Sequence, residues 1–471
     1  MDFNILEQGG EIPVADLMAL NGMLQKSATA GYQNPSSGGG SLGPLMPQSI
    51  QNTLDSATFT MEQVKFWQQL IKEPISQTMH EFTRVDSHGD PLSPYIPEGG
   101  GGTVQTSRYT KSSVQVKYLA DRRQVSDVGT MVGLIGPNPQ ALAEETERGT
   151  LSLLGKLERE LFYGDSDANA LAFDGVVKQI KAGGNTSDLR GAVPTPNDLQ
   201  RVLGALFSAP RYGTPDTIYV EPRVHASLIE YSNQFGRHEQ VRRENGVLTY
   251  GHDQIMITGP GGAVPVKAAP FMHRGELVPA AATAYGGTDK PVISGAATQT
   301  AVAGASVTSN FVAADNGTYI YSWIGVNTAT DGGNSARLDI AGVAVVAGDG
   351  VTLEISNETG VVYWKLYRSP VGGTADQARF IGDFAINVLG GAGTTQIIDD
   401  NDILPSASPI IFANHSRSHM KWVQLLDFLR RPVSDQGLTV KPFLLMLFGA
   451  LAVKVPSKMW VVENAGNNGS F

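Results

Sequence analysis

The sequence predicts an α+β protein that is built around one long helix and interrupted by an all-β module. Three observations support this. Apolar residues recur at helical spacing between Asn138 and Asp165. Residues from Thr106 to Val125 include a stretch in which polar and apolar side chains alternate with the period of a strand. Residues 284–404 contain no histidine or methionine, although the whole chain has 8 histidines and 12 methionines.

Composition limits the classes of function that the chain can have. Its 471 residues are sufficient for two or three domains, and it contains no cysteine, which excludes disulfides and thiolate metal sites. A net charge of −10 argues against binding nucleic acid through bulk positive charge. The N-terminus lacks the pattern of a signal peptide, and the longest apolar run, Phe443–Val453, is too short to span a bilayer. We therefore expect a soluble protein of a cytoplasm-like compartment.

The long helix has clear start and stop signals. Asn138 is a suitable N-cap, Pro139 fits the first helical position, and Gly164 is expected to end the helix in the left-handed conformation. Glu144 and Arg148 are spaced to form an ion pair on the exposed side. Residues that follow, through Ile180, are expected to be strand-like. The apolar stripe consists of Leu142, Thr146, Gly149, Leu153, Leu157 and Leu161.

Four features are expected before this helix. A short amphipathic segment, Val14–Leu24, precedes a Gly-, Ser- and Pro-rich arm from Gln25 to Gln48. A helix over Met61–Lys72 is expected to begin with a capping box of Thr60 and Gln63. A long hairpin follows, with arms at Thr78–Asp86 and Thr106–Val125 and a tip that contains the glycine run 99–102. Such a hairpin needs another surface to stabilise it.

Alternating helices and strands after Pro194 predict an α/β domain that extends to about Pro279. Thr195 and Pro196 start its first helix. The chain returns to this texture after Ala407, so we expect residues 284–404 to be an insertion in one host fold. Expected elements are a helix from Pro196 to Pro210, a strand at Thr217–Val220, a helix at Pro222–Tyr231, a strand at Gln254–Thr258, a strand or helix at Trp422–Arg430, an apolar segment at Leu438–Val453 and a strand at Lys458–Val462.

The inserted segment is predicted to be a β-sandwich, because short strand patterns alternate with turn residues. Its sequences YIYSWIGVN and VVYWKLYRSP resemble those of immunoglobulin or fibronectin type III modules that lack cysteine. Trp323 and Trp364 are the expected core residues. Predicted strands are Gly317–Ile324, Ala336–Val345, Val351–Ile355, Val361–Tyr367, Arg379–Ala385 and Thr395–Ile398.

Motifs for catalysis or cofactor binding are weak. Ser41 lies in a G-x-S-x-G match whose flanks are flexible arm, whereas a nucleophile elbow needs a strand and a helix. Asp165–Asn169 begins like a calcium loop, but Ala170 replaces the required glycine. Asp399, Asp400 and Asp402 form an acidic cluster that is either a solvated linker or a divalent-ion site. We expect no enzyme activity, no cofactor and no metal.

Basic residues gather in three places along the sequence. We interpret these clusters as intersubunit salt bridges or solvated faces, and the alternative is that they contact a polyanion. Aromatic residues are sparse around them, so base stacking is not indicated. These basic residues are Arg122 and Arg123; Arg237, His238, Arg242 and Arg243; and Arg430 and Arg431.

The order of arm, hairpin, long helix, α/β domain and apolar C-terminal strands resembles the major capsid proteins of tailed bacteriophages, which have the Hong Kong 97-type fold. The resemblance lies in VKYLADRRQVSD (Val116–Asp127), LERELFYGD (Leu157–Asp165), TIYVEPRVHASLI (Thr217–Ile229) and LFGALAVKVPSKMWVVEN (Leu447–Asn464). It implies an N-terminal arm and first helix (1–77), an extended loop (78–127), a spine helix and peripheral domain (128–190), an axial domain (191–283), the immunoglobulin-like insertion (284–404), and a return to the axial and peripheral domains (405–471).

This resemblance implies a subunit that assembles into the hexamers and pentamers of an icosahedral shell in the bacterial cytoplasm and then resides in the virion. Expected partners are separate scaffolding, portal and decoration proteins, with double-stranded DNA enclosed and no membrane. Gly149 and Gly155 are expected to be points of close backbone approach, and Gly149→Leu to impair assembly more than folding. A surface adhesin or decoration protein that works through the sandwich is the alternative. Candidate intersubunit contacts are Gly99, Gly102, Lys111, Lys117, Arg122, Arg123, Glu144, Arg148, Gly149, Arg237, Arg242 and Arg243.

Overall fold

The computed structural model describes most of the chain after residue 57. The predicted arm, the segment Val14–Leu24, Ser41 and the expected helix start at Asn138 and Pro139 lie outside the described residues. The described ranges are 58–89, 95–131, 140–235, 255–280, 284–286, 288–293, 299–328, 332–340, 342–387, 393–434 and 439–466, with backbone only for 232–235, 242–244, 247–249 and 285.

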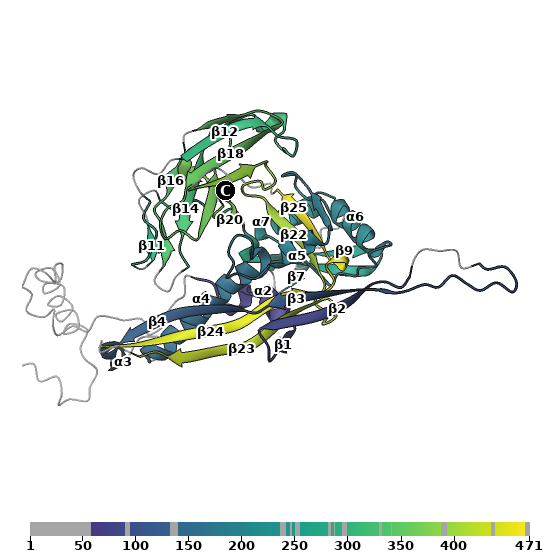
Figure 1. Ribbon diagram of the computed structural model, residues 1–471, viewed down its shortest axis with the longest axis horizontal. Helices are drawn as coiled ribbons and strands as arrows, with labels where there is room; N and C mark the ends of the chain where they lie inside the picture. Colours follow the sequence, from purple (N-terminus) through teal and green to yellow (C-terminus); the bar gives the residue numbers. More distant parts are fainter. Residues whose placement is uncertain are drawn as a thin grey trace, which may run out of the picture. The chain divides into compact units, whose positions relative to one another are not determined.

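The long helix, α4 (Ala141–Tyr163), packs on a four-stranded sheet whose strand order is β1-β23-β24-β4 (Figure 1). Leu153, Leu157 and Leu161 of the predicted stripe are at most 2% exposed, so this part of the prediction is confirmed. The undecided segment from Trp422 to Arg430 is a strand. The four strands are β1 (Lys72–Pro74), β23 (Met420–Pro432), β24 (Val440–Val453) and β4 (Lys117–Ser126).

A six-stranded sheet of order β5-β25-β22-β6-β10-β9 forms the second layer of the host fold. Strand β6 (Thr217–Val220) has the predicted bounds, and Thr195 caps α6 (Pro196–Phe207) as expected by accepting from the Asp198 N–H. Strand β10, which pairs with β6 and β9, was not predicted. The remaining elements are α5 (Val176–Ala182), β5 (Thr186–Asp188), α7 (Pro222–Phe235), β9 (Met256–Gly259), β10 (Gly262–Ala268), β22 (Ser408–Ala413) and β25 (Trp460–Ala465).

The segment of changed composition forms a sandwich of β-sheets around one core. Trp323 and Trp364 are fully buried in it with their ring centroids 6.0 Å apart, as predicted. Its likeness to immunoglobulin domains stays a prediction. The strands are β11 (Tyr285–Gly286), β12 (Gln299–Ala305), β13 (Gly317–Tyr319), β14 (Tyr321–Val326), β15 (Gly333–Asn334), β16 (Leu338–Asp339), β17 (Val343–Val345), β18 (Asp349–Ser356), β19 (Tyr363–Arg368), β20 (Arg379–Ala385) and β21 (Thr394–Asp399).

Strands on both sides of the sandwich in sequence belong to the same sheet of the host. Strand β22, which follows the sandwich, pairs with β6, and β6 also pairs with β10, which precedes it. The host sheet therefore closes without a strand from residues 284–404. Within the sandwich, the predicted strand Gly317–Ile324 is two strands in different sheets, β13 and β14, and strand β12 was missed.

The predicted helix over Met61–Lys72 is wrong beyond its first turns. Thr60 and Gln63 form the expected capping box, but the helical part is a 3₁₀ turn, η2 (Met61–Gln63), and the short α2 (Lys65–Gln69). The chain then becomes extended as β1, which pairs with β23. Pairing with a strand about 350 residues away overrides the local helical pattern.

The end of α4 also differs from the prediction. Gly164 does not adopt the left-handed backbone conformation. Glycine is needed at this position for a steric reason, because a Cβ would lie 2.4 Å from the Phe173 carbonyl oxygen. The segment through Ile180, expected to be strand-like, contains helix α5. Val176, Val177 and Ile180 are spaced for one helical face, and all three are buried in the core beneath α4.

A buried carboxylate joins α4 to α2. Glu158 is fully buried, and its two carboxylate oxygens accept from the backbone N–H groups of Phe66 (2.7 Å) and Trp67 (2.9 Å) in the first turn of α2. Burial raises the pKa of Glu158 to about 7, and the backbone donors oppose this rise. The carboxylate thus satisfies otherwise unpaired helix N–H groups, at the cost of removing a charge from water.

Glu158 predicts how stability depends on pH. The pKa of Glu158 in the folded protein lies above its ordinary value of 4.5, so the folded state binds the proton more tightly than the unfolded state does. The stability that this proton contributes is complete below pH 4.5 and is lost as pH rises through about 7. We expect Glu158→Gln to flatten the fall in unfolding free energy between pH 5 and 8 by on the order of 2–4 kcal/mol. Urea unfolding of unassembled protein measures this, with the exposed Glu62→Gln as control. An unchanged slope in Glu158→Gln would contradict it.

Candidate assembly surfaces

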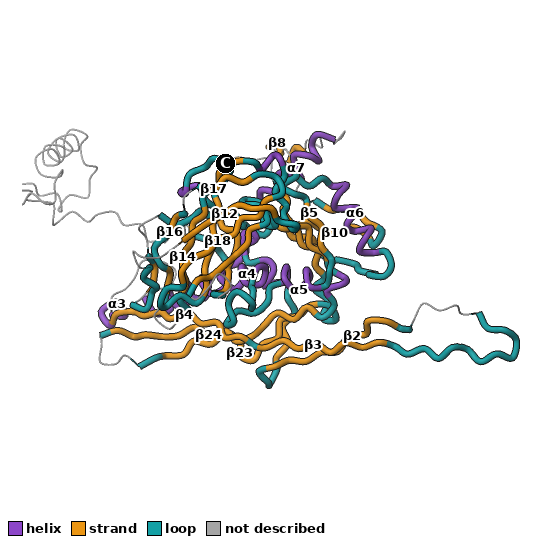
Figure 2. Tube along the Cα trace, turned by 45° about the horizontal axis from the view of Figure 1, so that its top comes forward, coloured by secondary structure: helices purple, strands orange, loops and turns teal. Residues whose placement is uncertain are grey.

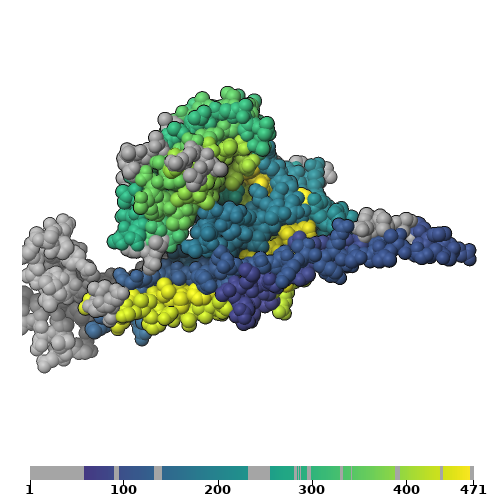
Figure 3. Space-filling view, viewed as in Figure 1, coloured from purple at the N-terminus to yellow at the C-terminus, as the bar shows by residue number. Residues whose placement is uncertain are grey.

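Strands β2 (Met79–Ser87) and β3 (Arg108–Gln115) form the predicted hairpin and leave the four-stranded sheet side by side (Figure 2). No residue of either strand is buried, and the space-filling view shows the hairpin extending uncovered beyond its base (Figure 3). An isolated two-stranded hairpin is marginally stable in water. The hairpin is therefore suited to gain its stability from a second surface.

The second arm of the hairpin is shorter than predicted. Val116 is 1% exposed, and its N–H donates to the Thr78 carbonyl at 2.9 Å, which closes the base of the hairpin. Beyond it, β4 pairs with β24 instead of β2. The alternation through Val114, Val116 and Tyr118 continues along the chain, but the strand changes partners at Val116, a switch that periodicity does not reveal.

The tip of the hairpin carries apolar side chains in water. The Gly100 N–H donates to the Pro97 carbonyl at 2.9 Å, which closes a β-turn over residues 97–100. Gly99, the third residue of this turn, has a φ of +77°, as a type II turn requires. Tyr95 and Val104 are 89% and 91% exposed. Gly102 lies in the same exposed tip.

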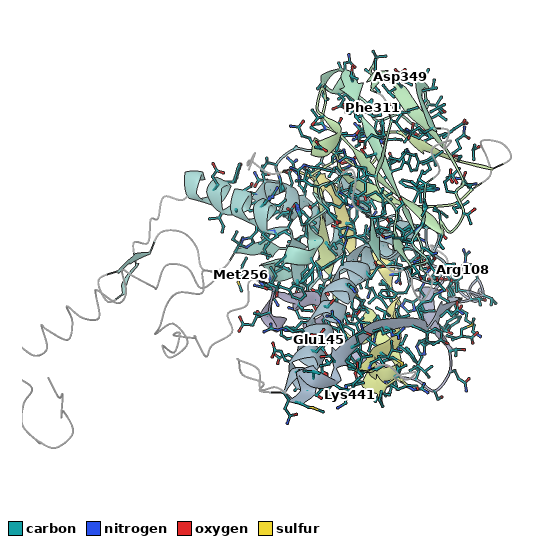
Figure 4. The ribbon with its side chains drawn as sticks, turned by 90° about the vertical axis from the view of Figure 1, so that its left-hand side faces the viewer. Arg108, Glu145, Met256, Phe311, Asp349 and Lys441 are labelled. Atoms are coloured by element: carbon teal, nitrogen blue, oxygen red, sulfur yellow. The ribbon has the colours of Figure 1, made fainter. Side chains whose placement is uncertain are left out.

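The predicted contacts on and near α4 have partners inside the chain. Glu144 and Arg148 form the expected ion pair at 2.7 Å. Arg123 on β4 donates to Asp121 and, at 2.8 Å, to Glu145, which is labelled on α4 in Figure 4. Of these ion pairs, Arg123–Glu145 joins the helix to its sheet.

The remaining candidates are less connected to one another. Lys111 forms an ion pair with Glu81 across the hairpin, Lys117 donates to the Ala170 carbonyl at 2.7 Å, and Arg122 is exposed. Arg237 lies outside the described residues. Only the backbone of Arg242 and Arg243 is described, in the short strand β7 (Arg242–Glu244), which pairs with β8 (Val247–Thr249). Their roles as intersubunit contacts stay predictions.

The two acidic motifs are filled by groups of the protein. The ammonium of Lys178 contacts Asp165, Asp167 and Asp174 at 2.5–2.9 Å, where the calcium-loop reading would place an ion. In the other motif, Arg368 pairs with Asp399 at 2.6 Å, while Asp400 and Asp402 accept from Thr308 and Asn310. Within the described ranges, no group of three acidic or histidine side chains is arranged to hold a metal.

The sandwich is attached to the host through the segment just before it. Backbone N–H groups of Val278 and Phe380 donate to the carbonyls of Ala378 (2.9 Å) and Glu276 (3.0 Å), so this segment pairs with the start of β20. Arg159 of α4 forms an ion pair with Glu276 at 2.7 Å. Burial raises the pKa values of Glu160 on α4 and Asp383 on β20 at the same junction.

A cationic cluster was missed by the sequence analysis. Arg417, Lys421 and Lys454 meet around Glu73. These residues come from β1, from β23 and the turn before it, and from the residue after β24, so only strand pairing brings them together. No motif signal joins residues that are more than 300 positions apart.

The structure confirms the expected Hong Kong 97-type capsid fold. Its elements are the short helix α2, the extended hairpin, the long helix on a four-stranded sheet, and a six-stranded sheet flanked by α6 and α7. Comparison with known sequences confirms the resemblance to phage major capsid proteins. The chain is 21% identical over 449 residues to the major capsid proteins of Staphylococcus phage S25-3 and Staphylococcus phage K, covering 90% of this chain and 90% of each relative. No protein-family model matches the chain.

Three solved structures illustrate the similarity of this chain to known structures. Gordonia phage Cozz gives a TM-score of 0.45 at 11% identity, covering 92% of this chain and 97% of that one. The capsid of the native GTA particle gives 0.45 at 9% identity, covering 92% and 99%. The SrpI encapsulin complex from Synechococcus elongatus gives 0.42 at 11% identity, covering 91% and 95%. Among the described residues, no helix is long and apolar enough to cross a membrane.

The structure changes the prediction made for Gly149. A Cβ at this position would lie 2.6 Å from Leu445 Cδ1 and 3.3 Å from Arg123 Cγ, and a Cβ at Gly155 would lie 2.6 Å from the ring of Phe59. Both glycines admit side chains of their own chain, not a neighbouring backbone. The expectation that Gly149→Leu impairs assembly more than folding stays a prediction, but these contacts indicate a cost to folding as well.

We now expect Gly149→Leu to lower the unfolding free energy by about 1–3 kcal/mol, because the leucine overpacks the buried contact between α4 and β24. Gly204→Ala in α6 is the control, since a Cβ there meets no atom within 4 Å, and it should raise stability by about 0.4–1 kcal/mol. Urea unfolding of unassembled protein measures both changes. Equal stability of Gly149→Leu and wild type would contradict the prediction, because it would show that the α4–β24 contact can accommodate the larger side chain.

Proposed function

We propose that this chain is the major capsid protein of a tailed double-stranded DNA bacteriophage, and that its copies form the hexamers and pentamers of an icosahedral shell. The observation that carries the proposal is the similarity to phage major capsid proteins over 90% of both chains. The hairpin supports it, because its two strands have no buried residue and a second subunit would supply the surface that they lack. Its role is structural, without catalysis.

The shell would assemble in the bacterial cytoplasm with separate scaffolding and portal proteins, and decoration proteins would bind it. It would enclose DNA without sequence-specific contacts, which suits a chain of net charge −10. We also propose the division into arm (1–77), extended loop (78–127), spine and peripheral domain (128–190), axial domain (191–283 and, shared with the peripheral domain, 405–471) and inserted sandwich (284–404). The sandwich would face outward.

Purified chain tests the function directly. Electron microscopy of the protein, expressed alone or with the other structural proteins of its source, is expected to show closed shells, and mass spectrometry of purified virions is expected to find this chain as the dominant protein. Small soluble oligomers only, or virions without the chain, would overturn the proposal.

Deletion of the sandwich distinguishes the capsid function from the alternative of an adhesin or decoration protein. Because β22 and β10 both pair with β6, the host sheet does not depend on the insertion, and we expect a chain that lacks 286–403 to form shells still. The matched control lacks the hairpin tip, 95–105, and should fail to form shells. Loss of shells in the first variant, with its unassembled fold intact by circular dichroism, would make the sandwich an assembly element.

A further inference from the structure

The cationic cluster of Arg417, Lys421 and Lys454 contains more positive charge than its one carboxylate balances. Glu73 Oε1 lies 2.7 Å from Lys421 Nζ, and Glu73 Oε2 lies 3.1 Å from Arg417 Nε. The side chain of Lys421 is 3% exposed, whereas that of Arg417 is 70% exposed. The cluster therefore has a buried floor and an accessible rim.

Lys454 adds a third cation to this site. Burial and the neighbouring charge of Lys421 lower the pKa of Lys454. His80, at the base of the hairpin, lies in the field of both lysines, and its Nε2 is buried without a hydrogen-bond partner in the described structure. Two of the three cations contact the one carboxylate and Lys454 lies beside Lys421, so the site is suited to accept a second carboxylate.

Apolar side chains lie on the same segments as the cluster. Ile71 precedes β1, two residues from Glu73, and is 39% exposed. Met79 is next to His80 in β2 and is 53% exposed, but neighbouring strand residues point to opposite faces, so only Ile71 is counted with the cluster. A partner that presents one carboxylate beside apolar side chains would therefore match both features of this surface.

The hairpin tip has this chemistry. Glu98 is the only charged residue between positions 91 and 107, and it is exposed in the turn that Gly100 and Pro97 close. Tyr95 and Ile96, three and two residues before it, are 89% and 56% exposed. Negative charge and apolar surface are thus presented together by the tip.

The tip cannot reach the cluster of its own chain. His80 lies near the cluster at the base of the hairpin, and the β2–β3 ladder continues from His80 to Ser87 before the tip begins. At about 3.3 Å per residue, this separates Glu98 from the cluster by roughly 20 Å or more. An interaction between the two must therefore join different copies.

We propose that Glu98 at the hairpin tip of one copy binds the Arg417–Lys421–Lys454 cluster of a second copy, with Tyr95 and Ile96 covering Ile71. The inference rests on the proposed shell function and names one contact within it. It assigns a role to a cationic site in which, among the described residues, Glu73 pairs with two of the three cations. This contact would fix the position of each hairpin tip on the neighbouring copy, because the single charge of the tip has one matching cationic site there.

Charge exchange tests the contact in the full-length chain. We expect Glu98→Lys and Arg417→Glu each to raise the protein concentration needed for half-maximal shell formation at least tenfold, measured by light scattering and electron microscopy at 0.1 M NaCl. The double variant Glu98→Lys/Arg417→Glu should recover most of this loss, because opposite charges face each other again. Wild-type assembly should weaken as salt is raised, because part of the contact is exposed.

Asp289→Lys, which reverses an exposed charge on the sandwich loop, is the matched control and should assemble like wild type. Thermal unfolding of each unassembled variant shows whether folding is intact. Normal assembly of Glu98→Lys, or two impaired single variants without recovery in the double variant, would overturn this contact while leaving the shell function in place. Failure of the wild-type chain to form any shell would overturn the proposed function itself.

Discussion

The packing of α4 on the β4–β24 pair is the interaction on which the rest of the structure depends. A helix of 23 residues spans about 35 Å, and it must bury one face along that length to be stable. Leu153, Leu157 and Leu161 supply this face, and Gly149 allows β24 to approach through Leu445. The other elements of the host are arranged around this contact: α5 lies beneath the end of α4, and Glu158 holds α2 by its backbone N–H groups.

Stability is distributed unevenly along the chain, and this distribution fits an assembling protein. The helix–sheet layer is rich in fully buried aromatic and aliphatic side chains, including Trp422, Phe162 and Phe443. The two strands of the hairpin, only a few residues away in sequence, have no buried position. A rigid body with an incomplete extension can keep its fold before assembly and complete the extension on a neighbour. Low charge density, at 17% of residues, leaves surface available for such contacts.

The sandwich illustrates how a fold accepts a large insertion. Its own core is separate from those of the host, with Trp323 and Trp364 at the centre. It meets the host through a short stretch of backbone pairing, through Arg159 of α4 over the ring of Phe380, and through Arg190, which donates to the Asn310 carbonyl. Because the host sheet is completed by β22, β6 and β10, folding of the host and folding of the sandwich depend on different sets of contacts.

Local patterns in the sequence determined much of this architecture. The helix from Ala141 to Tyr163, the cap at Thr195, the strand Thr217–Val220 and the two core tryptophans each depend on neighbours within a few positions, and these predictions are confirmed. Only the tertiary structure decided the rest. Strand β1 replaced a predicted helix, one alternating run was divided between two sheets at Val116, and Lys421 met Glu73 across 348 positions. The physical reason is that strand pairing and charge clustering are set by partners distant in sequence, and periodicity carries no information about which partner is chosen.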